Sequence, residues 1–303
     1  MKRILVIGAK GMLGRDLLPI LRSASREAEV IGWDIEEIDI RQEAETRSKI
    51  EGLRPDTVIH IAAYTDVDGC EKNRDEAFRV NAEGVKHVVQ GAEGAGAKVV
   101  YLSTDYVFDG KKGEPYLETD SPHPLSVYGQ SKLRGEEYLQ ERLWNHLILR
   151  TQWLYGKYGR NFVDSVLRQA KEKPVLSIVD DQTGSPTYTV DLSKAMAALL
   201  QHGGRGIFHA ANQGACTWFA FGRFILRSSR IEKVDVIPIS SEALARPAVR
   251  PAYSVLDTQK LRREAGISLR RWSEAVKEYL ELCLGPQGPE WGSTDKSLPA
   301  GGD

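Results

Sequence analysis

The chain has 303 residues, and its 41 basic and 42 acidic side chains give a formal net charge of −1. This balance supplies no electrostatic attraction toward nucleic acid. No segment approaches the ~20 apolar residues of a membrane span, and the first apolar run is too short for a secretion signal. We therefore expect a cytoplasmic protein without nucleic-acid or membrane partners. Its three cysteines and six histidines show no disulfide or metal-site spacing, so we predict neither a disulfide bond nor a bound metal; metal dependence by other ligands stays open.

The chain opens with a run of apolar residues at 4–7, which is typical of a strand buried on both faces. Glycines follow at once, and a helix is predicted from there to about Leu21. Such glycines allow a tight turn and a close approach of the backbone to a pyrophosphate at the helix N-terminus. A second short run at 30–33 ends in Asp34, whose carboxylate suits the ribose hydroxyls of a dinucleotide. The glycines of this turn are Gly8, Gly11 and Gly14.

Further strand-like runs at 58–61, 99–102 and 147–149 alternate with segments of helix length. This alternation predicts an α/β fold, a Rossmann-type doubly wound parallel sheet with right-handed crossovers. Ligands of such sheets bind beyond the carboxyl ends of the strands. We expect one crevice there, where Gly8, Asp34, Ala62, Thr104 and Arg150 come together.

Tyr128 and Lys132 are four residues apart in a segment that we predict to be helical, so they share one face. A lysine ammonium near a phenol lowers the pKa of the phenol toward the working pH, where it is an efficient general acid. Thr104, at the end of a strand-like run, offers a hydroxyl to the same substrate oxygen. Such a Tyr-Lys pair alone is more often two side chains on a helix surface. The separate dinucleotide signal favours a ketone reductase, with the loop 110–124 as a candidate lid.

The Gly-x-x-Gly-x-x-Gly spacing resembles the short-chain dehydrogenase/reductase superfamily, in its extended branch that acts on nucleotide sugars. Three blocks are more specific: Ser-Thr-Asp-Tyr-Val-Phe-Asp-Gly at 103–110, Arg-Thr-Gln-Trp-Leu-Tyr-Gly at 150–156 and Asp-Asp-Gln-Thr-Gly-Ser-Pro-Thr at 180–187. Together they are similar to the dTDP-4-dehydrorhamnose reductases, and the resemblance covers residues 1–283.

The resemblance implies a catalytic set of Thr104, Tyr128 and Lys132, and substrate contacts from Thr104, Asp105, Tyr128 and Trp153. Its cofactor is NADPH or NADH. Asp34 favours NADH by repelling a 2′-phosphate, while Lys10 and Arg15 would partly offset that repulsion, so the preference stays open. The implied cofactor-binding residues are Gly8, Lys10, Gly11, Met12, Leu13, Gly14, Asp34, Asp39, Ile40, Ala62, Ala63, Tyr64, Leu102, Tyr128 and Lys132.

We predict a dinucleotide-binding domain over residues 1–152, to which some later segments return. A smaller lobe over 153–284 would mainly bind the sugar nucleotide, with helices at 161–170, 190–201, 218–227 and 271–284. Glycine and proline punctuate residues 285–303, which predicts a flexible tail.

The function that the resemblance implies is reduction of the C4 ketone of dTDP-4-dehydro-L-rhamnose to dTDP-L-rhamnose, for cell-surface polysaccharide synthesis. Two alternatives stay open: a reductase of another nucleoside-diphosphate 4-keto-6-deoxysugar, and a non-catalytic dinucleotide-binding regulatory subunit. A sugar-nucleotide dehydratase is disfavoured because Tyr106, and not a glutamate, follows Asp105. Since some relatives dimerise, a homodimer is compatible with the resemblance, but the sequence identifies no interface.

Overall fold

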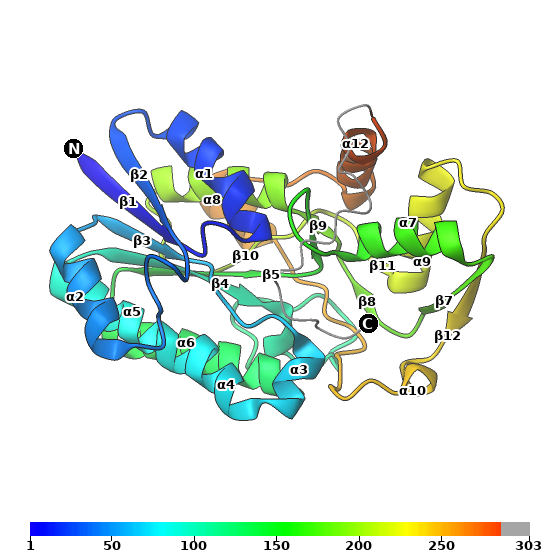
Figure 1. Ribbon diagram of the computed structural model, residues 1–303, viewed down its shortest axis with the longest axis horizontal. Helices are drawn as coiled ribbons and strands as arrows, with labels where there is room; N and C mark the ends of the chain where they lie inside the picture. Colours follow the sequence, from blue (N-terminus) through cyan, green and yellow to red (C-terminus); the bar gives the residue numbers. More distant parts are fainter. Residues whose placement is uncertain (286–303) are drawn as a thin grey trace.

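The computed structural model describes residues 1–285 and centres on one sheet of six parallel strands (Figure 1). The strand order is β10-β5-β4-β3-β1-β2, so the sheet is doubly wound, as predicted. Neighbouring strands pair in parallel throughout. The strands are β1 (Lys2–Ile7), β2 (Ala28–Trp33), β3 (Thr57–His60), β4 (Lys98–Thr104), β5 (His146–Thr151) and β10 (Gly206–His209).

Helices cover both faces of this sheet, and β1 shows why its sequence is apolar throughout (Figure 1). Ile4 and Val6 pack on one side, in the core that includes residues of α1 and α8. Leu5 and Ile7 pack on the other, in the core that includes residues of α2, α5 and α6. Successive side chains of a strand point to opposite faces, so a strand covered on both sides has no polar alternation. The helices are α1 (Met12–Ala24), α2 (Glu43–Leu53), α5 (Gly84–Ala95), α6 (Val127–Arg142), α8 (Thr189–Gln201) and α11 (Gln259–Ala265).

A second lobe lies beyond the carboxyl ends of the strands, at the opposite end of the molecule from the N-terminus (Figure 1). Its separate core includes Tyr155, Phe221 and Tyr279. The helices predicted at 161–170, 218–227 and 271–284 are confirmed here to within two residues. The helix predicted at 190–201 is α8, which packs against the six-stranded sheet. The predicted tail, apart from Gly285, lies outside the described residues. The elements of the lobe are β6 (Leu154–Tyr155), α7 (Phe162–Glu172), β7 (Val175–Val179), β8 (Thr183–Gly184), β9 (Thr187–Tyr188), β11 (Cys216–Thr217), α9 (Trp218–Ser228), β12 (Asp235–Ile239), α10 (Ser241–Leu244) and α12 (Trp272–Leu284).

Short helices and turns form the connection from β3 to α5 and the start of the loop that follows β4. These are α3 (Val67–Lys72), α4 (Arg74–Phe78), the π-helical turn η1 (Arg79–Glu83) and the 3₁₀ turn η2 (Asp105–Val107). In residues 1–285, no helix is both long enough and apolar enough to cross a bilayer.

The loop 110–124 is anchored at its middle by Tyr116, which is 4% exposed and stacks on Phe108. The backbone of Tyr116 exchanges hydrogen bonds with Val255 and Asp257. These contacts hold the loop against a distant segment of the chain, so it is not a lid hinged only at its two ends.

A buried ion pair joins α6 to the sheet. The Arg150 guanidinium on β5 donates to both carboxylate oxygens of Glu136 on α6, at 2.9 and 2.6 Å, and the side chains are 2% and 0% exposed. Ser103 on β4 donates to the same carboxylate at 2.5 Å. Charges so far from water persist only when they are paired and hydrogen-bonded.

We expect Glu136→Gln to lower the free energy of unfolding by about 3–5 kcal/mol, because it leaves the Arg150 cation buried without its counter-charge. The matched control is Glu93→Gln, which removes an exposed partner of Arg142, at 46% exposure, and should cost about 1 kcal/mol or less. Denaturant unfolding followed by circular dichroism measures both. Equal costs for the two variants would contradict this account of the buried pair.

Candidate active site

The turn after β1 has the geometry that a dinucleotide pyrophosphate requires. Gly8 has φ +97°, and a Cβ there would lie 2.7 Å from the backbone nitrogen of Ala62, which follows β3. A Cβ on Gly14 would lie 2.3 Å from the Gly8 carbonyl oxygen, so α1 packs against the turn only because this residue is glycine. Gly11 begins α1 without a side-chain cap, and its space is open apart from that same carbonyl oxygen. The uncapped amides of the first helical turn can therefore bind an anion.

Asp34 lies at the end of β2, beside this turn. Its carboxylate accepts hydrogen bonds from the backbone nitrogens of Lys10 at 2.7 Å and Ile35 at 2.9 Å. The Lys10 ammonium is paired with Glu36 at 2.8 Å, and the Arg15 side chain donates to the Lys10 carbonyl. Both cations that were expected to offset the Asp34 charge are thus already engaged.

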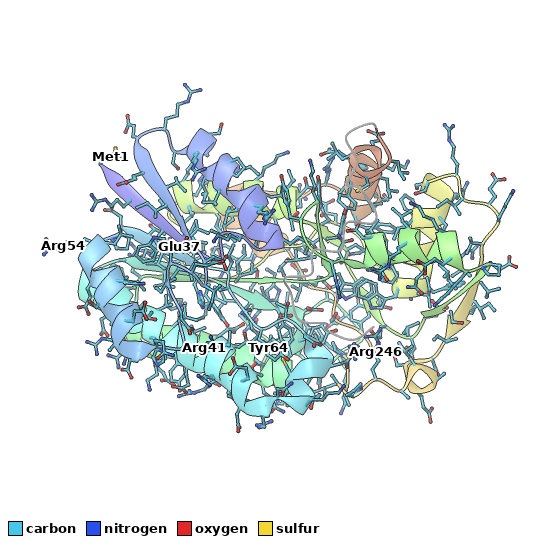
Figure 2. The ribbon with its side chains drawn as sticks, in the orientation of Figure 1. Met1, Glu37, Arg41, Arg54, Tyr64 and Arg246 are labelled. Carbon is cyan, nitrogen blue, oxygen red and sulfur yellow. The ribbon has the colours of Figure 1, made fainter. Side chains whose placement is uncertain are left out.

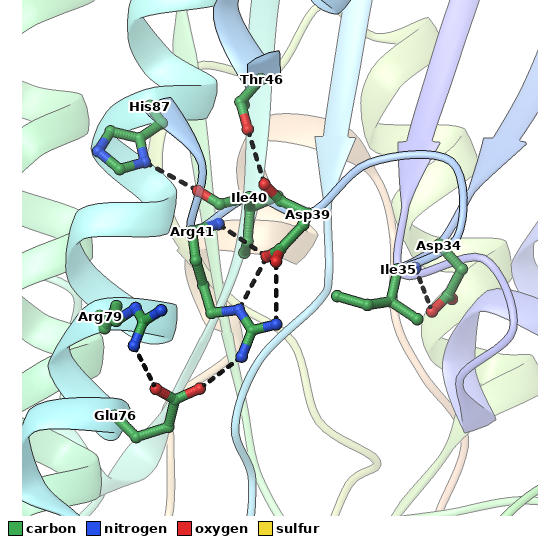
Figure 3. Close-up of polar contacts among 9 residues, drawn as sticks. All are labelled: Asp34, Ile35, Asp39, Ile40, Arg41, Thr46, Glu76, Arg79 and His87. Carbon is green, nitrogen blue, oxygen red and sulfur yellow. Dashed lines mark hydrogen bonds and ion pairs between the residues drawn. The ribbon is translucent and has the colours of Figure 1, made fainter. Parts of the chain in front are cut away.

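Two predicted cofactor residues at the next loop have structural partners, which Figure 3 shows. The Asp39 carboxylate accepts from Arg41 at 2.8 and 2.9 Å, and this hydrogen bonding lowers the pKa of Asp39. The Ile40 side chain is buried, and its carbonyl oxygen lies 2.8 Å from Nδ1 of His87. The Leu13 side chain is likewise in the core. Ile40 and Leu13 therefore have only backbone atoms to offer a cofactor, whereas Met12 is partly exposed.

Ala62, Ala63 and Tyr64 follow β3 and are all partly exposed (Tyr64 is labelled in Figure 2). Asn81, in the π-helical turn, bonds both backbone groups of Tyr64, at 2.8 and 3.0 Å. Its amide also donates to the Ser131 hydroxyl at 3.1 Å, on the helix that carries the predicted catalytic residues. Asn81 thereby fixes the loop after β3 relative to α6, and sequence reasoning gave it no such role.

The structure brings the three predicted catalytic residues together. Thr104 ends β4, Tyr128 lies in the first turn of α6, which Ser126 caps, and Lys132 lies one turn later. The Thr104 hydroxyl lies near the Tyr128 phenol and favours its ionised form, while it donates to the Asp105 carboxylate at 3.0 Å and accepts from the Tyr106 backbone nitrogen at 3.2 Å. The Lys132 ammonium donates to the Leu102 carbonyl at 2.7 Å and lies 4.1 Å from the centre of the Tyr101 ring.

The electrostatics of this group differ from the expectation for Tyr128. Burial first, and then the nearby Asp105 carboxylate, raise the pKa of Tyr128 instead of lowering it. Burial lowers the pKa of Lys132 to about 7, although Glu136 opposes the decrease. The expected activation by lysine was therefore wrong for the protein alone: desolvation and Asp105 raise the pKa of Tyr128, which is held as a phenol.

Asp105 is 1% exposed and accepts a hydrogen bond from the Thr104 hydroxyl at 3.0 Å. Burial raises the pKa of Asp105 to about 7, although the hydroxyl groups of Ser254 and Thr104 oppose the increase. The Asp105 carboxyl group therefore changes charge near neutral pH while it is in contact with the Thr104 hydroxyl.

A cavity of about 630 Å³ lies in the second lobe. Tyr106 lines it and packs edge-on against Tyr128, with 5.5 Å between ring centroids. Four cations and three aromatic rings contribute to its wall, and only one carboxylate does. The cations are Arg168, Lys173, Arg246 and Arg250, the rings are Tyr106, Phe162 and Trp218, and the carboxylate is Glu172.

Two of these cations are held by Asp68 on α3. Arg250 donates to both of its carboxylate oxygens, at 3.0 and 2.9 Å, and Arg246, labelled in Figure 2, donates at 3.1 Å. Burial alone would raise the pKa of Asp68, but the hydrogen bonds from Arg250 lower it to about 2. This bridge fixes the cavity wall to the domain that carries Tyr128.

Trp153, the remaining predicted substrate residue, is partly exposed and follows β5. It stacks on Trp218, which sequence reasoning had assigned only to a helix. The block at 180–187 predicted no role for Trp218, because the two are distant in the chain: Gln182 and Trp218 are 36 positions apart. Within residues 1–285, no group of three or more histidine, cysteine, aspartate or glutamate side chains is placed to hold a metal ion.

The raised pKa of Asp105 predicts a pH-dependent stability. An unfolded aspartate titrates near ~4. Between about pH 4 and about pH 7 the folded protein keeps the Asp105 proton, which the unfolded chain has lost, so stability falls as pH rises. The unfolding free energy of the wild type should therefore fall relative to that of Asp105→Asn across this window.

Denaturant titrations at several pH values measure that difference. The control is Asp109→Asn, because backbone and side-chain hydrogen bonds lower the pKa of Asp109 and its titration lies below the window. A constant difference between wild type and Asp105→Asn from pH 4 to pH 7 would refute the raised pKa.

Comparisons with known proteins agree with this geometry. A family model described as the RmlD substrate binding domain matches residues 1–284. The chain is 41% identical over 292 residues to a dTDP-4-dehydrorhamnose reductase of Streptomyces griseus, covering 94% of this chain and 95% of the relative. It is 40% identical over 281 residues to the spore coat polysaccharide biosynthesis protein SpsK of Bacillus subtilis, covering 93% and 98%.

Among solved structures, a dTDP-4-dehydrorhamnose reductase of Bacillus anthracis in complex with NADP superimposes with a TM-score of 0.88 at 39% identity. The match covers 92% of this chain and 99% of that one. Since the family model and these relatives each cover nearly the whole chain, the protein belongs to the dTDP-4-dehydrorhamnose reductase family.

Proposed function

We propose that this protein reduces the C4 ketone of dTDP-4-dehydro-L-rhamnose to dTDP-L-rhamnose with NADPH or NADH. The observation that carries the proposal is the placement of the Thr104 hydroxyl near the Tyr128 phenol, one helical turn from Lys132, at the strand ends that also carry the glycine turn. The name of the Streptomyces griseus relative supports the reaction, and the NADP complex of the Bacillus anthracis relative supports the cofactor.

A reduced nicotinamide, when bound, supplies the hydride. The protein supplies the proton: Tyr128 is a phenol at neutral pH because its pKa is raised, so it is ready to protonate the ketone oxygen as negative charge develops there. The Thr104 hydroxyl, which donates to Asp105 in the protein alone, would turn to donate a hydrogen bond to the same oxygen. That bond strengthens as the charge grows, so it stabilises the transition state more than the bound ketone.

Lys132 acts on the phenol and not on the substrate. Its hydrogen bond to the Leu102 carbonyl fixes the ammonium one turn below Tyr128, where its charge stabilises the phenolate left after proton transfer. With a pKa of about 7, this lysine is only partly charged near neutral pH, and Glu136 favours its charged form. The Asp105 carboxylate raises the pKa of Tyr128 by repelling the phenolate, so the protonation state of Asp105 affects how readily Tyr128 gives up its proton.

The cavity of the second lobe is where we place the nucleotide. Its arginine and lysine side chains suit a diphosphate, and its aromatic rings suit a flat base. Residues 1–152 would then bind the dinucleotide and residues 153–284 mainly the sugar nucleotide, with Asp105 and Trp153 in contact with the hexose. We also propose a cytoplasmic location, where nucleotide sugars and reduced dinucleotides are available. The homodimer stays a prediction.

The reaction is tested by following oxidation of NADH and NADPH with enzymatically prepared dTDP-4-dehydro-L-rhamnose. In Tyr128→Phe we expect kcat to fall on the order of 100-fold to 10,000-fold, because the proton donor is gone, while both ligands still bind. The control is Tyr138→Phe on the same helix, whose hydroxyl contacts Glu83 at 2.9 Å and should be dispensable for turnover.

Normal turnover in Tyr128→Phe would remove Tyr128 from the mechanism. A wild type that binds cofactor but oxidises none of it would exclude this substrate, and would favour another 4-keto sugar or a regulatory role.

Cofactor preference is tested at Asp34. Removing its charge in Asp34→Asn should favour NADPH, and we expect the ratio of the NADPH Kd to the NADH Kd to fall about tenfold, or ~1.4 kcal/mol. Nicotinamide fluorescence measures both constants without turnover. The control is Glu29→Gln at the other end of β2, where the carboxylate pairs with Arg3 at 2.9 Å and the ratio should not change. An unchanged ratio in Asp34→Asn would show that this carboxylate does not govern the choice.

A further inference from the structure

Trp153 has an unusual backbone conformation. Its φ is +47°, in the left-handed region that bulky side chains rarely adopt. Such a conformation persists only where surrounding contacts hold it, and it is often found at functional sites. The contacts that hold Trp153 are therefore informative.

The Trp153 indole lies flat on the Trp218 indole, with 3.5 Å between ring centroids and 9° between ring planes. Trp218 in turn donates its Nε1–H to the Gln182 side chain at 3.2 Å. Gln182 donates to the Ser241 hydroxyl at 2.7 Å, so its amide is oriented from both ends. The stacked pair is thus held by a chain of hydrogen bonds that begins near α10.

Gly184 provides the space for this stack. A Cβ on Gly184 would lie 2.5 Å from Cε2 of Trp153, well inside contact distance. The backbone of Thr187 also donates to the Trp153 carbonyl at 3.1 Å. Gln182, Gly184 and Thr187 all belong to the block at 180–187, so that block builds a slot for one indole.

The slot lies between the two halves of the site. Gln182 and Trp218 line the cavity of the second lobe. Trp153 is two residues beyond Thr151, which pairs with Thr104 in the sheet. The indole pair therefore links a residue that lines the cavity, Trp218, to the segment that follows the strand next to Thr104.

We propose that Trp218, Gln182 and Gly184 are positioning residues that hold the Trp153 indole between them, so that the indole edge bounds the position of the hexose ring and orients the C4 ketone toward Thr104 and Tyr128. This inference rests on the proposed function, because it takes a 4-keto hexose as the substrate. The indole is fixed before the sugar binds, so little ordering is required on binding. The expected effect is on the orientation of the sugar, and small errors of orientation at a reacting atom have large effects on rate.

The first test is Gly184→Ala. Two indoles stacked this closely give coupled bands in far-ultraviolet circular dichroism, which a separated pair lacks. We expect the variant to lose this signature and its kcat/KM for dTDP-4-dehydro-L-rhamnose to fall on the order of 100-fold, while the Kd for NADH is unchanged. The control is Gly52→Ala on α2, where an added Cβ meets nothing within 4 Å.

A second pair of variants does not depend on how Gly184→Ala folds. Trp218→Leu removes the stacking surface, and Trp218→Phe keeps an aromatic ring. We expect Trp218→Leu to lose most of kcat/KM for the sugar and Trp218→Phe to recover most of it, with cofactor binding equal in both. A general structural role would lower cofactor binding as well.

Full kcat/KM in Trp218→Leu would overturn the inference while leaving the proposed function intact. Equal losses in the leucine and phenylalanine variants would also overturn it, because they would show that stacking is not what matters. A wild type that shows the coupled bands but does not turn over the sugar would refute the proposed function, and this role with it.

Discussion

The buried charge pair of Glu136 and Arg150 is the constraint on which the rest of the site depends. It fixes α6 against β5, and the Ser103 hydroxyl adds β4 to the same carboxylate. Because α6 carries Tyr128 and Lys132, and β4 carries Thr104, this one cluster sets the distance between the two hydroxyl groups. A helix held only by apolar packing has no comparable restraint on its register. The same carboxylate favours the charged form of Lys132, so one buried group serves both geometry and electrostatics.

That arrangement separates the two states of Tyr128. In the protein alone, burial and Asp105 raise the pKa of Tyr128 and so hold the proton on the phenol. Burial also lowers the pKa of Lys132 to about 7, so this side chain is only partly charged near neutral pH. In the proposed mechanism, proton transfer to a substrate oxygen would leave a phenolate one helical turn from the ammonium, where the attraction between opposite charges is strong in a site shielded from water. The residue would thus be protonated when an acid is needed and stabilised once the proton has left.

Much of the fold follows from the sequence, since apolar runs such as 4–7 are typical of strands covered on both faces, and the glycines that follow identify the turn after β1. The positions of Thr104, Tyr128 and Lys132 were predictable for the same reason: strand ends and helical spacing bring them together. The pKa of Tyr128 was not, because desolvation depends on the whole surrounding structure. The same holds for Trp218, Gln182 and Asp68, whose partners are 36, 59 and 182 positions away in the chain. Local pattern carries no information on such distant contacts.

The division of labour between the two parts of the molecule follows from these contacts. Under the proposed function, the sheet would supply groups that act on any ketone: a proton donor, a hydroxyl and a cation beside a dinucleotide turn. Choice of substrate would then come from the second lobe, whose cations and aromatic rings are linked to the rest of the molecule by connections that include the Asp68 bridge and the stacked indoles. On that proposal, a change of lobe residues that kept these two connections would alter which sugar is reduced without altering the chemistry, in keeping with relatives that are named for different 4-keto sugars.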